Sequence, residues 1–443
     1  MSRLVRLLVV AASAAALSAG AGAQLLGVGA LPPVALPVPT NNLPVAGPVL
    51  QNILSQPGAQ QAISPTLDTV GGLSEPIASS GAANLLDLRR MRLRELIRSN
   101  RASLEDDGNG LPVRRGVVAV IGPDPAGLGA ALRSGFRIQA DEVDPNLGIR
   151  MVSLAVPHGM SAKAGLKLLQ RIAPELQADF DHLFEPAGGP LAPSAGAIAA
   201  FQGGGSGRTI GMIDGGVASH PSLAGKSIEQ NGFAGAPQPT GHGTAVASLL
   251  VGSQGPFRGA ATGARLLVAD VYGGNRAAGS ATAIVRALGW LAGHHPQVIN
   301  ISLVGPPNKL VERAIDIVES RGIRIVAAVG NDGPAAPPQF PASYPGVIAV
   351  TAVDAGGRAL PEAGRASHLD FAAPGADMAA ALPGNGYTRV RGTSFAAPLA
   401  AARLLDDGSL SALAAEARPG KGHIGRGIVC GFCRIDPRSV GAR

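Results

Sequence analysis

The chain contains the stretch Ile323-Arg324-Ile325-Val326-Ala327-Ala328-Val329, a nearly continuous apolar run typical of strands buried on both faces of a parallel sheet. Similar runs recur through the second half of the chain and alternate with segments of helical periodicity. We expect strands at 209–213, 264–271, 298–303, 323–329 and 347–353, and helices at 242–251, 280–292, 310–320 and 394–405. This alternation predicts an α/β fold, in which a parallel sheet is flanked by helices.

A smaller pattern lies upstream. Strand-like runs at 116–121, 136–143, 149–156 and 179–184 alternate with helical segments at 125–135 and 161–172, the second of which Ser161 would cap. The order β-α-β-β-α-β is that of a small ferredoxin-like α+β domain. An amphipathic helix at 85–100, with arginines on its polar face, precedes this domain. The helix could lie on a membrane or pack against the downstream part of the chain, and we favour packing.

The N-terminal residues resemble a targeting segment. Arg3 and Arg6, an apolar centre at 7–17 and the small residues Ala21-Gly22-Ala23 predict a secretory signal peptide over 1–23, with an uncleaved anchor as the alternative. No later stretch has the length and apolarity of a membrane span, so we expect an exported, soluble chain.

Two segments read as linkers between the folded units. Residues 24–84 are rich in Pro, Gly and Ala without periodicity, which is typical of a disordered linker. The similar stretch 185–207 predicts an exposed linker with a processing site. We therefore divide the chain into 1–23, 24–84, 85–186, 187–207 and 208–443.

Composition narrows the class of function. The formal net charge is +7, but aromatic residues make up only 3% of the chain and are not interleaved with basic runs. We therefore expect no nucleic-acid partner. The two cysteines, Cys430 and Cys433, are too few for a structural zinc site. In an exported chain their spacing favours a local disulfide, with a redox-active pair as the alternative.

Three polar residues stand beside glycines at the ends of predicted elements. Asp214 ends the first strand of the larger domain, His242 opens a helix, and Ser394 begins the last helix, which it would cap. Each has an ordinary structural interpretation on its own. In the order Asp, His, Ser they match a catalytic triad, in which histidine takes the serine proton and aspartate stabilises the imidazolium. Asn331, directly after a buried strand, and the backbone N–H of Ser394 would stabilise an oxyanion.

Four stretches resemble the signature blocks of the subtilisin-like serine proteases, or subtilases. They are Ile210-Gly211-Met212-Ile213-Asp214-Gly215-Gly216, Gly241-His242-Gly243-Thr244-Ala245-Val246-Ala247, Ala327-Ala328-Val329-Gly330-Asn331 and Gly392-Thr393-Ser394-Phe395-Ala396-Ala397-Pro398. The resemblance implies an endopeptidase with an Asp214–His242–Ser394 triad and Asn331 in the oxyanion hole. It also implies that Ser302, Leu303 and Gly330 bind an extended polypeptide substrate along the sheet edge. Asp332, beside Asn331, is a candidate for selecting a basic side chain at P1, the residue directly before the cleaved bond.

The resemblance extends upstream with less specific motifs. Subtilases are commonly made as zymogens, and residues 115–186 have the size, order and position of their prodomain, which acts as an intramolecular chaperone and inhibitor. The resemblance therefore implies that the protein is made as a self-processing zymogen and is secreted or periplasmic. Family members often bind calcium, but no acidic run has calcium-loop spacing, so no metal or cofactor is assigned. The alternative is a catalytically inactive, subtilase-like binding protein of the cell envelope.

The sequence departs from the family pattern at three positions near these blocks. Ala245 stands where the family usually has a second histidine, Phe395 where methionine is frequent, and Leu399 where histidine is common. None of the three belongs to the triad or supplies the oxyanion donor, so the expected activity does not depend on them.

Overall fold

The computed structural model describes residues 82–187 and 207–442. The signal peptide expected at 1–23 and most of the two linkers lie outside these residues. In the described part of the chain, no helix combines the length and apolarity that are needed to cross a membrane.

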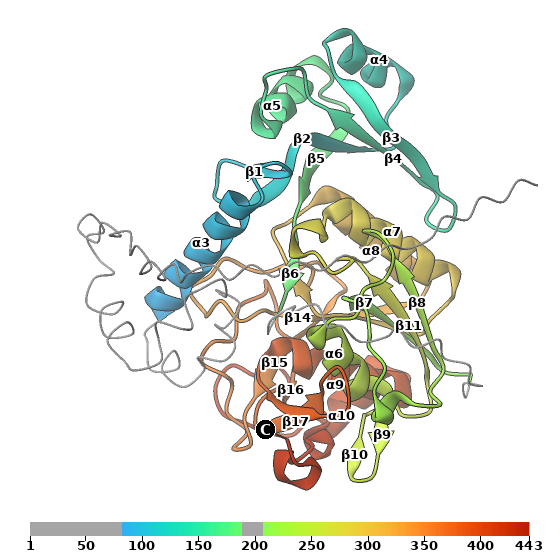
Figure 1. Ribbon diagram of the computed structural model, residues 1–443, viewed down its shortest axis with the longest axis vertical. Helices are drawn as coiled ribbons and strands as arrows, with labels where there is room; N and C mark the ends of the chain where they lie inside the picture. The colour runs from blue at the N-terminus through green and yellow to red at the C-terminus, as the bar shows by residue number, and fades with distance from the viewer. Residues whose placement is uncertain (1–81, 188–206, 443) are drawn as a thin grey trace, which may run out of the picture. The chain divides into compact units, whose positions relative to one another are not determined.

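A seven-stranded sheet, with every neighbouring pair of strands parallel, organises the larger part of the chain (Figure 1). Across the sheet the strands are β16 (Phe371–Pro374), β15 (Ile348–Val353), β14 (Arg324–Ala328), β12 (Val298–Ile301), β7 (Thr209–Asp214), β11 (Arg265–Asp270) and β8 (Ile228–Gly232). The chain first adds strands on one side of β7 and then on the other, so β7 and β12 flank the topological switch point. Ligands of such sheets bind at the carboxyl ends of the strands beside this point.

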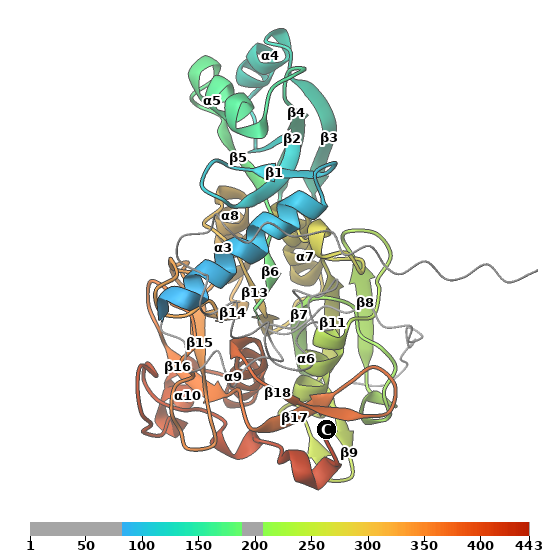
Figure 2. The same ribbon diagram turned by 60° about the vertical axis from the view of Figure 1, so that its left-hand side comes forward.

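Alternate residues of the five inner strands face two separate apolar cores, which explains the nearly continuous apolar runs. On β14, Val326 and Ala328 face one core and Ile325 and Ala327 face the other, and all four are buried. The first core is closed by α6 (Gly241–Val251) and α9 (Thr393–Asp407), and the second by α7 (Ala281–Gly293) and α8 (Lys309–Ser320) (Figure 2). The predicted α/β fold, with helices on both faces of a parallel sheet, is confirmed.

Several short elements were not predicted from the sequence. They are β8 and β16 in the sheet, the hairpins β9 (Ser253–Gln254) with β10 (Phe257–Arg258) and β17 (Met378–Ala381) with β18 (Tyr387–Val390), and α10 (Leu410–Glu416). The strand β8 lies at the sheet edge, where Glu229, Gln230 and Asn231 remain partly exposed. An edge strand therefore needs no apolar run, and it left no such signal in the sequence.

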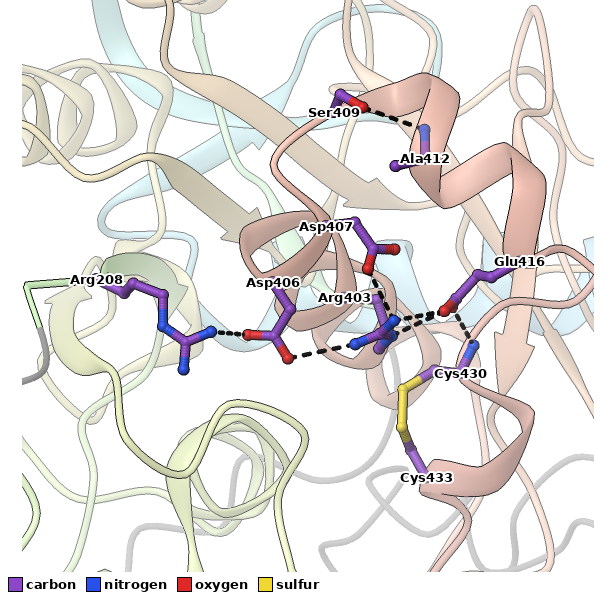
Figure 3. A network of polar contacts seen from close by, with 9 residues as sticks. All are labelled: Arg208, Arg403, Asp406, Asp407, Ser409, Ala412, Glu416, Cys430 and Cys433. Atoms are coloured by element: carbon purple, nitrogen blue, oxygen red, sulfur yellow. Dashed lines mark hydrogen bonds and ion pairs between the residues drawn. A yellow bond between two sulfur atoms is a disulfide. The ribbon is translucent and has the colours of Figure 1, made fainter.

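The C-terminal segment is fixed to α9 by charged side chains (Figure 3). Arg403 of α9 pairs with two carboxylates of its own helix and, at 2.6 Å, with Glu416 of α10. The other carboxylate oxygen of Glu416 accepts the backbone N–H of Cys430 at 3.0 Å. Cys430 forms a disulfide with Cys433, which confirms the favoured interpretation of this pair. Arg208, just before β7, pairs with Asp406 of α9. This contact joins the start of the larger part of the chain to its last long helix.

The upstream residues form a second, antiparallel sheet. Its strands are β1 (Leu104–Asp106), β2 (Pro112–Ile121), β4 (Ile149–Ala155) and β3 (Arg137–Asp144) in that order, with β5 (Gln177–His182) also paired to β2. α4 (Pro125–Arg133) and α5 (Ala162–Ile172) complete the expected β-α-β-β-α-β order. Ser161 caps α5 as predicted, because its side chain accepts the N–H of Ala164.

This smaller sheet contacts the N-terminal ends of two helices of the larger part. Asp181 of β5 accepts the N–H of Thr282 in the first turn of α7 at 3.0 Å, and Asp179 accepts the N–H of Lys309 in α8 at 2.9 Å. A carboxylate at a helix start satisfies an otherwise unpaired N–H and complements the helix dipole. The two sheets are therefore joined by specific polar contacts.

The amphipathic helix is α3 (Ala82–Ser99), and it packs against downstream residues, as the favoured interpretation predicted. Leu85 and Leu93 of this helix are buried. Leu85 lies so close to Gly333 that a Cβ on this glycine would come within 2.9 Å of it. The helix therefore contacts the loop directly after Asn331.

Candidate active site

Asp214 and His242 meet at the carboxyl end of β7. His242 is the second residue of α6, and its Nδ1 lies 2.9 Å from Oδ1 of Asp214, with both side chains fully buried. The N–H of Gly215 donates to the same Oδ1 at 2.7 Å and orients the carboxylate. The start of α6 approaches β7 this closely because residue 243 is glycine: a Cβ there would lie 2.3 Å from the carbonyl oxygen of Gly215.

Ser394 lies in the first turn of α9, but it is not the N-cap that we predicted from the sequence. The cap is Gly392, with a φ of 140°, and Thr393 and Ser394 are already helical. Thr393 takes the structural role instead, since its Oγ1 accepts the N–H of Gly330 at 3.0 Å. The hydroxyl of Ser394 is buried and has no hydrogen-bond partner in the described part of the chain.

Asn331 lies three residues after the end of β14 and directly after Gly330, and one end of its side-chain amide is anchored. Its Oδ1 accepts the N–H of Thr393 at 3.0 Å, whereas its Nδ2 is buried without a partner among the described residues. A Cβ on Gly392 would lie 2.9 Å from this Nδ2, so glycine at that position leaves the room that the amide needs. The N–H of Ser394, in the first turn of α9, has no intrahelical acceptor either. The side-chain amide of Asn331 and the backbone N–H of Ser394 are thus two hydrogen-bond donors beside the serine.

Four buried atoms without hydrogen-bond partners in the described part of the chain belong to the four residues predicted to do chemistry. They are Asp214 Oδ2, His242 Nε2, Asn331 Nδ2 and Ser394 Oγ. The ring of His242 packs against Phe395, the residue after Ser394, with 5.4 Å between ring centroids. The hydrogen bond from Ser394 Oγ to His242 Nε2 is not formed here. Such bonds are often long until substrate binds, and unsatisfied buried polar atoms are otherwise costly.

The predicted substrate-binding residues lie beside the serine. Ser302 donates its hydroxyl to the carbonyl oxygen of Ser394 at 3.0 Å, and Leu303 begins the short strand β13 (Leu303–Val304). Gly330 has a φ of 86°, and a Cβ there would come within 3.1 Å of a methyl group of Val304. These residues form one edge of the site.

The expected exposed linker at 185–207 is wrong at its start. Glu185 and Pro186 form β6 (Glu185–Pro186), which pairs antiparallel with β13, and the N–H of Ala187 donates to the carbonyl oxygen of Ser302 at 2.8 Å. Glu185 and Ala187 are buried. The segment lies inside because the edge of β13 offers unpaired backbone groups that a neighbouring strand can satisfy.

A cluster of charged side chains lies beside β6 and was not predicted from the sequence. Arg92 of α3 contacts both Glu185, at 3.2 Å, and Asp332, at 3.0 Å. Arg89 also pairs with Asp332 at 3.0 Å, and Arg276 pairs with Glu185 at 3.4 Å. Asp332, which we considered as a selector of basic substrate side chains, is thus occupied by arginines of α3. The only sequence signal was a helix face carrying more arginines than its own acidic residues could pair.

Opposite charges set the electrostatics of this cluster. Burial alone would raise the pKa of Glu185, but the guanidinium groups of Arg92 and Arg276 outweigh it and hold that pKa below its ordinary value. Burial would likewise lower the pKa of Arg92, yet the carboxylates of Glu185 and Asp332 raise it. Both partners therefore stay charged although Glu185 is buried and Arg92 is largely covered.

The fold and these side chains at the carboxyl ends of its strands define the class as an α/β serine peptidase. Residues 205–405 match the family model for the subtilase family. Subtilisin Savinase from Lederbergia lenta is 33% identical over 199 residues, which are 44% of this chain and 73% of that protein. Thermitase from Thermoactinomyces vulgaris is 33% identical over 210 residues, 44% of this chain and 72% of thermitase. The chain belongs to the subtilase family.

Two further comparisons show how far the likeness reaches. An alkaline protease from Alkalihalobacillus alcalophilus is 33% identical over 199 residues, but the match spans only 52% of its length. The crystal structure of fervidolysin from Fervidobacterium pennivorans, a keratinolytic enzyme related to subtilisin, aligns with a TM-score of 0.59 at 19% identity. It covers 75% of this chain and 61% of fervidolysin, and this likeness concerns the fold.

Proposed function

We propose that this protein is an exported endopeptidase, made as a self-processing zymogen, that cleaves polypeptides through Asp214, His242 and Ser394. The observation that carries the proposal is the buried 2.9 Å contact between Asp214 and His242, beside a serine whose hydroxyl has no hydrogen-bond partner among the described residues. This set of groups supplies a base, an orienting carboxylate and a nucleophile.

In the first half of the reaction, Ser394 Oγ attacks the carbonyl carbon of a peptide bond, and His242 Nε2 takes the hydroxyl proton. The electron pair moves to the carbonyl oxygen, which accepts hydrogen bonds from Asn331 Nδ2 and the N–H of Ser394. The pair then returns, the C–N bond breaks, and the leaving amine takes the proton from His242. Water repeats these steps on the acyl-enzyme and releases the new carboxyl terminus.

A serine-directed fluorophosphonate tests this assignment on wild type and Ser394→Ala after the upstream segment has been removed from both, which for the variant requires an added protease because it should not process itself. We expect one label per active molecule in the wild type and none in Ser394→Ala. Labelling of both proteins would show that a residue other than Ser394 reacts and would contradict the mechanism. Labelling of neither after the upstream segment has been removed would favour an inactive binding protein.

The second part of the proposal concerns residues 85–186, which would act as chaperone and inhibitor of the peptidase domain at 208–443. Support comes from β6, because a chain segment that pairs with β13 beside Ser394 occupies the edge that a substrate would use. We expect cleavage within 185–207, and the contact between Ala187 and Ser302 favours the bond after Ala187.

Processing can be followed in the secreted full chain. Wild type should yield a shortened form that begins directly after Ala187, as read by mass spectrometry, whereas Ser394→Ala should stay at full length. Identical processing of the two proteins would show that another protease makes the cut. Export itself is tested by fractionation, with the protein expected in the periplasm or medium and retained in the cell when residues 1–23 are deleted.

A further inference from the structure

The segment Phe184-Glu185-Pro186-Ala187 lies in the active site as an extended strand between two partners. On one side β6 pairs with β13, with Glu185 opposite Val304 and the N–H of Ala187 on Ser302. On the other side the N–H of Phe184 donates to Gly279 at 2.7 Å. Ser302 accepts the N–H of Ala187 and itself contacts Ser394, so we take Ala187 as the residue directly before the bond that would be cleaved. This register makes Glu185 the third residue before the bond that would be cleaved.

The carboxylate of Glu185 meets cations of two different origins. Arg92 belongs to α3, upstream of the cleavage window, and would leave with that segment. Arg276 lies in the short helix η4 (Arg276–Ala278), between β11 and α7, and stays with the peptidase domain. Its Nη2 lies 3.4 Å from Oε1 of Glu185, and its side chain is only 24% exposed. The processed enzyme therefore keeps one cation at the place of the third residue.

We propose that Arg276 is a specificity-determining residue that selects substrates with an acidic side chain at the third position before the cleaved bond. The inference rests on the proposed function, because it takes β6 as a stand-in for substrate. When it forms an ion pair, a guanidinium that is partly buried beside the edge that binds the substrate strand loses less side-chain entropy than a surface cation. Salt also screens its charge less. Its contact with a carboxylate would lower the energy of the bound substrate strand.

Asp332 is the competing influence on this position. It also touches Arg92 and carries the charge that would repel an acidic residue and attract a basic one. The contact of Glu185 with Arg276 favours an acidic side chain at the third position. Cleavage of peptides that differ at this position distinguishes an acidic preference from a basic one. Because the third position will be more exposed once α3 has left, we expect a modest effect, about five-fold in kcat/KM, as for a partly exposed ion pair.

The test uses three acetyl-capped peptides, Phe-X-Pro-Ala with one chromogenic leaving group, where X is Glu, Gln or Lys. Processed enzyme is prepared from the full chain as wild type, Arg276→Gln and Arg276→Lys, and active sites are counted with the fluorophosphonate label. Wild type should prefer Glu to Gln by about five-fold, less so at high salt, and Lys should be poorest. Arg276→Gln should cleave Glu and Gln peptides equally, and Arg276→Lys should recover part of the preference.

The ratio of two substrates on one enzyme preparation cancels any loss of folded protein. Arg321→Gln is the matched control, because Arg321 is exposed just before the amino end of β14, opposite the site, and should leave the ratio unchanged. A wild-type ratio near one, a preference for Lys, or an unchanged ratio in Arg276→Gln would overturn the inference while peptide cleavage continues. Absence of both cleavage and label would overturn the proposed function and this inference with it.

Discussion

The side-chain amide of Asn331 uses its oxygen in a structural hydrogen bond and leaves its N–H group available. One end of the amide is fixed by the N–H of Thr393, and the other end is a buried donor without an acceptor in the described residues. An unsatisfied buried donor costs about 1–3 kcal/mol. A developing oxyanion would repay that cost in the transition state alone, which is the condition for raising kcat.

Replacement of Asn331 by alanine should therefore lower kcat by about 10²–10³ and leave KM nearly unchanged. Asn331→Asp is the matched variant, because it keeps the oxygen that accepts from Thr393, removes the N–H donor and adds a negative charge beside the oxyanion. We expect Asn331→Asp to lose at least as much activity as Asn331→Ala in peptide assays. Full activity of Asn331→Asp would mean that the residue acts by holding Thr393 in place.

Much of the site's identity could be predicted from local signals in the sequence. Asp214, His242 and Asn331 stand beside glycines at strand ends or helix starts, where a parallel sheet gathers its functional residues. The cap assigned to Ser394 was wrong because Gly392 adopts a φ that a residue with a side chain rarely reaches. The contacts of Arg92 could not be predicted, since they join residues 93 and 240 positions apart.

At the scale of elements, α3 adds further contacts to the pairing of β6 with β13 beside Ser394. Arg92 links β6 to the loop after Asn331, and Leu85 covers that loop at Gly333. Removing one partner of a buried ion pair leaves an uncompensated charge and costs about 3–5 kcal/mol. We therefore expect the helix to strengthen the inhibition that we propose for the upstream segment.

Arg92→Gln should shorten the delay between processing and the appearance of peptidase activity by about ten-fold. Processing is followed on gels and activity with a peptide substrate in the same samples. Arg94→Gln is the control on the same helix, because Arg94 is exposed. An equal delay in wild type and both variants would show that α3 contributes nothing to inhibition.

A second element, α8, carries a carboxyl group in an unfavourable place. Burial, with Asp316 nearby, raises the pKa of Glu319 from its ordinary 4.5 to about 7. Folding then takes up a proton between these pH values, so this group costs stability as the pH rises through that window.

Glu319→Gln should therefore raise the free energy of unfolding at pH 8 by about 1–2 kcal/mol and change it little at pH 4, where both side chains are neutral. Thermal unfolding of the Ser394→Ala chain avoids self-digestion during the measurement. Glu312→Gln, exposed on the same helix, should show no such rise at pH 8. An equal effect of Glu319→Gln at both pH values would refute the role of titration.

At the scale of the whole molecule, four segments far apart in sequence meet in one ionic cluster. Arg92, Glu185, Arg276 and Asp332 come from α3, β6, η4 and the loop after β14. A buried ion pair contributes little net stability over apolar packing, but it penalises every arrangement that leaves a charge unpaired. The cluster therefore specifies how the upstream segment and the peptidase domain fit together.

Glu185→Gln tests this specification through its pH dependence. Because the pKa of Glu185 is lower in the folded chain than in the unfolded one, its contribution is complete above about pH 4.5 and is lost as the pH falls through the folded value. In the Ser394→Ala background we expect Glu185→Gln to lower the free energy of unfolding by about 3–5 kcal/mol at pH 7. Below the folded pKa the two proteins should converge, since a protonated glutamate and a glutamine carry the same charge. A difference that persists undiminished down to pH 2 would mean that the carboxylate stabilises the chain by its shape and not by its charge.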